Sequence, residues 1–125
     1  MSKVRFMAQG DVFVCDLDGN KGSEQGGRRL CVVVSNPTDC AFSPTVQIVP
    51  ITSREKQYRA THHHLSQSDY PSFDRETNTV LCEQVRTIDK MRLGEKVCRL
   101  KEKDLYSVID CVLKCFYGLK DNNNI

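Results

Sequence analysis

The chain has 125 residues, the size of one domain with a hydrophobic core of its own. Its formal net charge of +2 is too small to indicate a nucleic-acid partner by itself, so such a partner must be argued from where the charges lie. No apolar run is long enough for a signal peptide or a membrane span, so we expect a cytoplasmic protein.

Short extended segments dominate the first hundred residues. β-Branched and aromatic residues between turn signals predict strands at residues 11–17, 30–34, 45–51, 79–82 and 96–100, with a further short strand within 61–65. Residues 30–34 are apolar throughout, so both faces of that strand should be buried. Pro50 indicates a sheet edge or a bulge. Asn36-Pro37-Thr38-Asp39 predicts a turn, and residues 53–78 are mostly polar.

The hydrophobic period changes near the C-terminus. Residues with helical spacing predict an amphipathic helix: Leu105, Val108, Ile109, Val112, Leu113 and Phe116. Lys101 is a poor N-cap for this helix, whereas Gly118 suits its C-terminal end. Without repeats or a linker, we expect a single domain over residues 1–125, a mainly β barrel with a C-terminal helix against it.

Seven cysteines are spread through the chain without a Cys-x-x-Cys pair. This spacing argues against a zinc knuckle or a thioredoxin-like redox site. Most of them, Cys111 and Cys115 on the helix included, lie in apolar runs, where a thiol packs like a small hydrophobic side chain. We therefore expect reduced thiols, in keeping with a cytoplasmic location.

A glycine-rich segment, Gly22 to Arg29, joins the first two predicted strands. Glycine allows the backbone to lie close to a partner, and arginine presents planar donors that suit a phosphate. The segment therefore suits an anion. A long polar hairpin tip is the alternative and, on these residues alone, the commoner one.

Five short motifs follow one another in order along the chain. They are Gly10-Asp11-Val12, Gly22-Ser23-Glu24-Gln25-Gly26-Gly27-x-Arg29, Ser43-Pro44-Thr45, Ile51-Thr52-Ser53-Arg54 and Glu83-Gln84-Val85-Arg86-Thr87-Ile88-Asp89-Lys90. From about residue 10 to 119 this pattern resembles the MazF/PemK/Kid family of bacterial toxin endoribonucleases. The resemblance implies an SH3-like small β-barrel of the CcdB/PemK toxin type with a C-terminal helix. It also implies a homodimer, an antitoxin partner, and cleavage of single-stranded mRNA at a short sequence without metal or cofactor.

The resemblance further implies roles for individual residues. Counting from Gly27 assigns the family's catalytic arginine to Arg29, with Thr52 as its catalytic partner at a strand end. Arg28 is an additional arginine, and Leu30 stands where the family has proline. Side chains alternate along a strand, so Arg28 and Arg29 cannot both reach one phosphate once the strand has begun.

The chemistry needs no metal if RNA supplies its own 2′-hydroxyl as the nucleophile, which leaves a 2′,3′-cyclic phosphate and a 5′-hydroxyl. Arg29 suits stabilisation of the charge on the phosphorane, because a guanidinium stays protonated and is a poor base. The Thr52 hydroxyl suits donation to a phosphate oxygen, or it bonds its own backbone as strand-end threonines often do.

Six further side chains are candidates for RNA binding: Ser23, Glu24, Gln25, Arg28, Arg54 and Gln84. The side chains of Ser23, Glu24 and Gln25 either form hydrogen bonds with the edges of RNA bases or are simply solvated. Gln84 either faces the groove or caps a turn at residues 86–90. Residues 54 to 64 form a positive strip, which suits the acidic, disordered tail of an antitoxin.

His62-His63-His64 lies in this strip, and only the first and third would share a strand face. No third ligand stands nearby in sequence, so we expect no metal, and interpret the histidines as an RNA-facing or solvent-facing segment. Three aromatic residues in the same region suit either base stacking or packing: Tyr58, Tyr70 and Phe73.

Two other functions remain open. A CcdB-like toxin binds gyrase without chemistry, but it has no need of a loop arginine paired with a strand-end threonine, and this chain lacks tryptophan. A catalytically degenerate family member is the other alternative, for which Leu30 is the hint.

Overall fold

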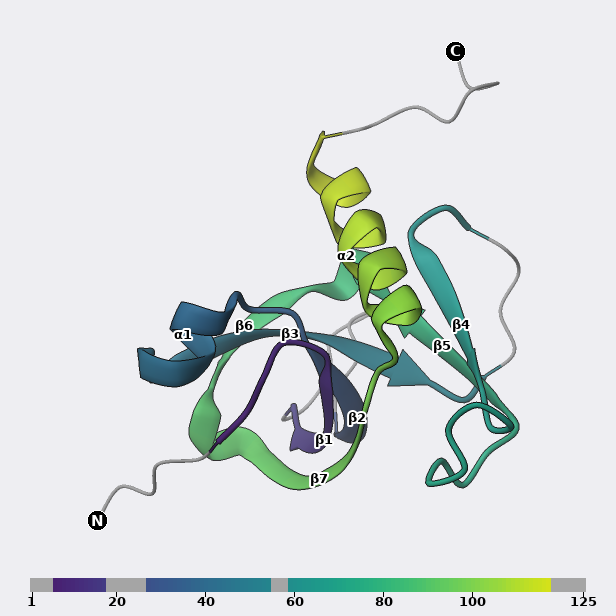
Figure 1. Cartoon of the computed structure of the whole chain (residues 1–125), viewed down its shortest axis with the longest axis horizontal. Coiled ribbons are helices and arrows are strands. Elements are labelled where there is room, and N and C mark those ends of the chain that lie inside the picture. Colours follow the sequence, from purple (N-terminus) through teal and green to yellow (C-terminus); the bar gives the residue numbers. More distant parts are fainter. Residues whose placement is uncertain (1–5, 18–26, 55–58, 118–125) are drawn as a thin grey trace.

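The computed structural model describes residues 6–17, 27–54 and 59–117. Figure 1 shows a strongly bent antiparallel sheet with one long helix across one side. The strands are β1 (Asp11–Asp16), β2 (Arg28–Val33), β3 (Thr45–Thr52), β4 (His62–Ser66), β5 (Thr77–Leu81), β6 (Arg86–Asp89) and β7 (Leu93–Arg99). The helices are α1 (Pro37–Phe42) and α2 (Glu102–Tyr117), with single 3₁₀ turns η1 (Cys82–Gln84) and η2 (Lys90–Arg92).

Strand β3 connects the two parts of the sheet. The strand order is β4-β5-β3-β2-β1-β7, and β6 pairs with β3 beside β5. The first half of β3 pairs with β6, and its last two residues, Ile51 and Thr52, pair with β5. Among the described residues no pairing of β6 with β7 closes the sheet, so the predicted small β-barrel with a C-terminal helix is present in an open form.

Pro50 lies at the gap between these two partners of β3. Gln47 directs both backbone groups toward β2: its N–H donates to Ser35 Oγ at 2.7 Å, and its carbonyl accepts from Val34 N at 2.9 Å. Backbone groups alternate along a strand, so the nitrogen of Pro50 faces the opposite edge. The pairing there skips Val49 and Pro50. Of the two alternatives for Pro50, a sheet edge is wrong because β3 is paired on both sides, whereas an irregularity remains, since the missing N–H faces a gap in the ladder.

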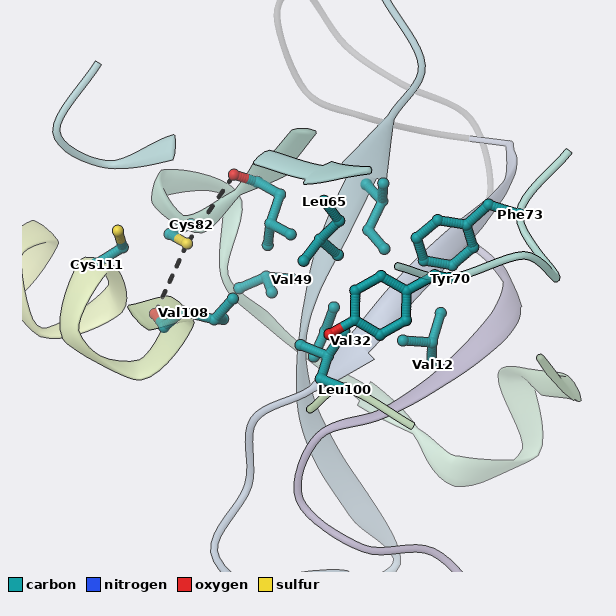
Figure 2. Packing of buried hydrophobic residues seen from close by; sticks show 12 residues of the cluster. Val12, Val32, Val49, Leu65, Tyr70, Phe73, Cys82, Leu100, Val108 and Cys111 are labelled. Atoms are coloured by element: carbon teal, nitrogen blue, oxygen red, sulfur yellow. Dashed lines mark hydrogen bonds between the residues drawn. The ribbon is translucent and has the colours of Figure 1, made fainter. Parts of the chain in front are cut away.

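The central strands are apolar on both faces, as predicted for residues 30–34. One face packs against α2, β4 and β5 around Val32, Val49, Tyr70 and Phe73, and Figure 2 shows this core from close by. The other face forms a second core from β1, β2, β3, β6 and β7, which includes Cys31. All seven cysteines are free, and five of them are buried. The prediction that they pack as hydrophobic side chains is confirmed.

The first family motif is a structural anchor. Gly10 has φ +95, which an L side chain rarely adopts. The buried carboxylate of Asp11 accepts from Ala8 N at 2.8 Å and lies 3.2 Å from Lys96 Nζ and 3.4 Å from Arg99 Nε. These contacts fasten the start of β1 to β7.

Two elements differ from the sequence predictions. The turn predicted at residues 36–39 is the start of α1, where Asn36 caps the helix by accepting from Asp39 N at 2.8 Å, and Pro37 occupies the first turn. Residues 86–89 form β6 instead of a turn. The remaining predicted strands and the C-terminal helix are present with ends shifted by a few residues.

No helix in the described ranges is long and apolar enough to cross a membrane.

Candidate active site

The pairing of β2 with β3 directs Arg29 and Thr52 to the same end of the sheet. Strands β2 and β3 pair antiparallel, with Cys31 opposite Pro50 and Val33 opposite Ile48. Because each step toward the start of β2 is a step toward the end of β3, this register continued by two residues brings Arg29 opposite Thr52. Directly opposite residues share a face of the sheet, so the two side chains project from the same face.

The neighbouring arginines face opposite ways. Arg29 is paired with Cys15 on β1 and lies two residues before Cys31, and both cysteines belong to the second core. Arg28 is the first residue of β2, so it projects to the other face together with Leu30. Because β2 has already begun at Arg28, the alternation of side chains along the strand does separate the two arginines.

Arg86 is a site residue that the sequence reasoning missed. It lies opposite Ile48 on β3, which places it on the face of Arg29 and Thr52. A hydrogen bond with Cys15 and burial raise the pKa of the Cys31 thiol, whereas the charges of Arg86 and Arg29 act to lower it. Both guanidinium groups are therefore close enough to act on one thiol. Only Ile88 of this four-residue strand is buried, so its sequence carried no hydrophobic alternation from which β6 could be predicted.

A polar row continues across the sheet from Arg29. Thr52 lies opposite Thr79 on β5, and Thr79 lies opposite His64 on β4. Thr79 Oγ1 and His64 Nδ1 are hydrogen-bonded at 3.0 Å. The row Arg29–Thr52–Thr79–His64 thus crosses four adjacent strands on one face. Only the registers of three strand pairs place these residues together, so sequence reasoning could not find Thr79.

The Thr52 hydroxyl has a backbone partner. Its Oγ1 accepts a hydrogen bond from Arg54 N at 3.2 Å, which is the backbone role that we weighed as the alternative. The hydroxyl proton is not used by this contact, so it can still be donated. The residue is 1% exposed, so a phosphate reaches it only when the atoms above it move.

The remaining candidate residues differ in how exposed they are. Arg54 and Arg28 are exposed, whereas Gln84 is half-buried at the end of η1, two residues before Arg86. Ser23, Glu24 and Gln25 lie outside the described residues. Gly27 has φ +73, and its carbonyl accepts from Leu17 N at 2.9 Å, so glycine is needed where the chain enters β2.

All three histidines have protein partners, that of His64 being Thr79. His62 is buried, with Nε2 3.1 Å from Glu83 Oε1, and His63 Nε2 lies 2.9 Å from Asp104 Oδ1 on α2. Only His64 is exposed. The interpretation of all three as an RNA-facing or solvent-facing segment is therefore wrong for His62 and His63.

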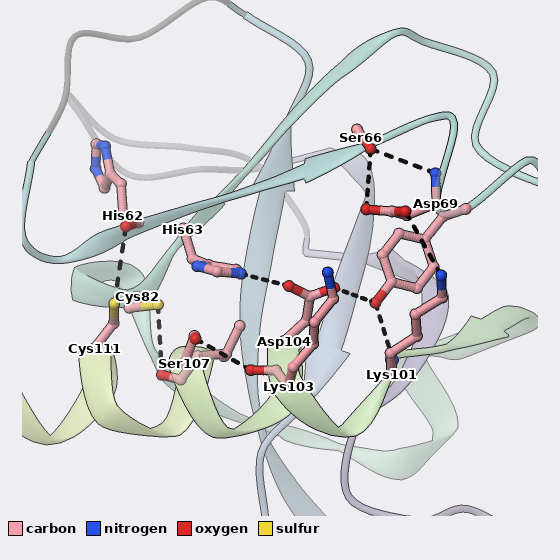
Figure 3. Close-up of polar contacts among 12 residues, drawn as sticks. His62, His63, Ser66, Asp69, Cys82, Lys101, Lys103, Asp104, Ser107 and Cys111 are labelled. Atoms are coloured by element: carbon pink, nitrogen blue, oxygen red, sulfur yellow. Dashed lines mark hydrogen bonds and ion pairs between the residues drawn. The ribbon is translucent and has the colours of Figure 1, made fainter.

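The polar network under α2 is drawn in Figure 3. Asp104 accepts from the Tyr70 hydroxyl at 2.5 Å in addition to contacting His63, and the Tyr70 oxygen accepts from Lys101 N at 2.9 Å. Tyr70 and Phe73 stack in the core with ring centroids 5.4 Å apart, so neither is a base-stacking platform. Tyr58 lies outside the described residues.

Metal ligands do not cluster in this part of the chain: within the described ranges, no three His, Cys, Asp or Glu side chains are placed to hold an ion.

Comparison with known proteins decides the family. The family model described as "PemK-like, MazF-like toxin of type II toxin-antitoxin system" matches residues 8–116. The chain belongs to this family. An Endoribonuclease MazF of Staphylococcus saprophyticus is 40% identical over 107 residues, which cover 85% of this chain and 88% of the relative. The match favours the ribonuclease over the gyrase-binding alternative.

Solved structures share the fold. MazF of Deinococcus radiodurans superimposes with a TM-score of 0.73 at 24% identity, over 92% of this chain and 99% of the other. An endoribonuclease in complex with its cognate antitoxin from a Mycobacterial species gives a TM-score of 0.72 at 21% identity, over 92% and 98% of the two chains.

Proposed function

We propose that this protein is the endoribonuclease toxin of a type II toxin–antitoxin system and that it cleaves single-stranded mRNA at a short sequence in the cytoplasm. The observation that supports this most directly is the β2–β3 register, which, continued by two residues beyond Cys31 and Pro50, brings Arg29 opposite Thr52. The relative from S. saprophyticus carries the name of that activity.

The proposed reaction uses the 2′-hydroxyl of RNA as the nucleophile. The 2′-oxygen bonds to the adjacent phosphorus, its proton passes to solvent, and the bond from phosphorus to the 5′-oxygen breaks. Arg29 stabilises the negative charge of the phosphorane and donates to the leaving 5′-oxygen. Thr52 donates to a phosphate oxygen, and Arg86 adds positive charge on the same face. The products are a 2′,3′-cyclic phosphate and a 5′-hydroxyl.

A cleavage assay in EDTA tests the proposal. Incubation with a mixed single-stranded RNA should give discrete fragments, because neither the nucleophile nor the charge stabilisation depends on a metal. A substrate with 2′-deoxy or 2′-O-methyl ribose at the cut position should resist. Cleavage of that substrate at the same bond, or loss of activity in EDTA, would contradict the mechanism, and absence of any cleavage would favour the degenerate alternative.

We also propose that the active unit is a homodimer, inhibited by the acidic, disordered tail of an antitoxin. Helix α2 has exposed apolar side chains that a second copy of the chain can cover. They are Tyr106, Leu113, Phe116 and Tyr117. The arginines at the strand ends suit the carboxylates of such a tail. Sedimentation should give a dimer, and the antitoxin should compete with RNA more weakly as salt rises. A monomer at micromolar concentration, or binding without displacement of RNA, would contradict this.

A further inference from the structure

Two adjoining hollows lie at the start of β2, and they include Arg29 of the candidate active site as well as Arg28. Their volumes are about 300 and 190 Å³, and both are lined by Arg28, Arg29, Leu30 and Asp74. Sites for small organic ligands span roughly 300–1,000 Å³, so the larger hollow is at the lower end of that range. A single nucleobase is of a suitable size, whereas a folded oligonucleotide is too large. We call the two together the Arg28 groove.

The groove has an apolar floor and a charged rim. Val14, Leu30 and Val97 line the larger hollow, which gives the face of a base an apolar surface. Arg75 lines the smaller hollow, so together with Arg28 and Arg29 three arginines border the groove. Guanidinium groups suit the phosphates on either side of a bound base.

Asp74 is an acceptor without a partner in the described chain. It is exposed and lines both hollows, yet no hydrogen bond or ion pair joins its carboxylate to another described residue. Its position is fixed by the buried Asn78, whose Nδ2 donates to Arg75 O at 3.0 Å and closes the turn into β5. A carboxylate in a groove lined by three arginines opposes a purely anionic occupant and suits one that carries both phosphates and N–H donors.

The groove is adjacent to the reacting groups. Ile51 and Ser53, the two neighbours of Thr52, both line the smaller hollow, and Arg29 itself lines both hollows. The smaller hollow therefore lies at the end of the sheet where β2 begins and β3 ends. An RNA strand that crosses this end can place one phosphate against Arg29 and Thr52 and turn the adjacent base into the groove.

On the basis of the proposed ribonuclease function, we propose that the Arg28 groove is a base-specificity subsite, which takes the base of a nucleotide next to the cut. The base is one with an exocyclic amino group (adenine, cytosine or guanine), and Asp74 accepts from that group. Single-stranded RNA is read from bases splayed out of the strand, and a carboxylate is a suitable acceptor for a base amino group. Uracil presents carbonyl oxygens at the corresponding positions and is disfavoured there.

Deep sequencing of the cut sites in a random single-stranded RNA library tests this subsite. D74N replaces an acceptor-only group by an amide that also donates, so discrimination against uracil at one position beside the cut should fall about tenfold. E76Q is the matched control, because Glu76 is an exposed carboxylate close by that lines neither hollow. R75Q should weaken cleavage at all sites without changing the preferred base. Unchanged relative site frequencies in D74N would overturn the proposal.

A binding measurement separates this inference from the proposed function. The wild-type protein should bind oligoadenylate or oligocytidylate more tightly than oligouridylate, and D74N should lose that difference while E76Q keeps it. If the wild type cleaves no RNA but shows this binding pattern, the ribonuclease function fails and the subsite remains. If the wild type cleaves and D74N keeps the wild-type preference in both assays, the subsite fails and the function remains.

Discussion

The polar groups under α2 and those at the ends of β2 and β3 differ in what they contact. Under the helix, His63, Asp104 and Tyr70 bond to one another, and both carboxylate oxygens of Asp104 are used. At the strand ends, Asp74, Arg28 and Arg54 are exposed side chains beside the candidate active site. Polar side chains whose bonds are made within the protein contribute to stability, whereas those left at the surface are available to a ligand. Substitutions should therefore affect stability in the first region and activity in the second.

Arg29→Ala should have the largest effect on activity. Loss of the group that stabilises the phosphorane should reduce the cleavage rate by more than about 10³-fold, while the melting temperature stays near that of the wild type. Arg28→Ala, on the opposite face, should weaken binding modestly and lower its salt dependence by about one unit of slope. Rates on a fixed RNA substrate at several salt concentrations measure both. If Arg28→Ala is the inactive variant, the assignment from the strand register is wrong.

Thr52→Ala should slow cleavage by about 10²–10³-fold, the usual loss when one donor to a developing oxyanion is removed. Single-turnover kinetics measure the rate, and thermal unfolding should show a small change. Thr52→Ser keeps the hydroxyl and should restore most of the rate. An unaltered rate in Thr52→Ala would leave this residue only its backbone contact to Arg54.

Arg86→Ala should reduce cleavage by about tenfold, because one charge on the reacting face is lost while Arg29 and Thr52 remain. Lys103→Ala is the charge control, because Lys103 is an exposed residue of α2 outside the candidate active site. Comparison of kcat and KM for the two variants distinguishes the outcomes. An equal loss of cleavage in both variants would show that only the overall charge matters, and that the position of Arg86 on the reacting face does not.

Asp104→Asn should act on stability alone. The variant weakens the bonds of a buried carboxylate to Tyr70 and His63, which should lower the free energy of unfolding by about 1–3 kcal/mol. Cleavage well below the melting temperature should be unchanged, as measured with the same substrate. A loss of cleavage without a loss of stability would break the distinction between the two regions.

Protonation of Asp104 in acid should also lower the free energy of unfolding. Burial alone would raise the pKa of its carboxyl, but hydrogen bonds from Tyr70 and His63 hold the pKa below its usual value of 3.8. A lowered pKa in the folded state adds stability that is complete above the unfolded pKa and is lost as the pH falls through the folded one. Denaturant unfolding below about pH 4 should therefore bring the wild type closer to Asp104→Asn. A constant difference between them at all acidic pH values would contradict this.

Local patterns in the sequence predicted most of the fold. Residues 30–34 are apolar throughout and form a strand buried on both faces, and the spacing from Leu105 to Phe116 gave the helix. The short elements were missed for physical reasons. α1 has only one buried residue, Cys40, and β6 only one, Ile88, so neither has a hydrophobic period to detect.

The site was predictable only in part. Arg29 and Thr52 came from the family resemblance, and the strand register now explains how residues so far apart in sequence meet. The histidines were misassigned because their partners, Glu83 and Asp104, are distant in sequence, and no local pattern reveals such pairs. The groove at Arg28 depends on how residues 72–78 fold against β2, which propensity does not determine.

The proline at position 50 has a consequence for how the site holds its substrate. Its ring fixes the backbone two residues before Thr52, and the pairing of Thr52 with Thr79 fixes the strand end. The short threonine side chain is therefore a preorganised donor whose position scarcely adjusts. Arg29 is the opposite, since its long side chain can follow its target. One rigid and one adaptable donor together can track a phosphate whose charge and geometry change as the bond to the leaving oxygen lengthens.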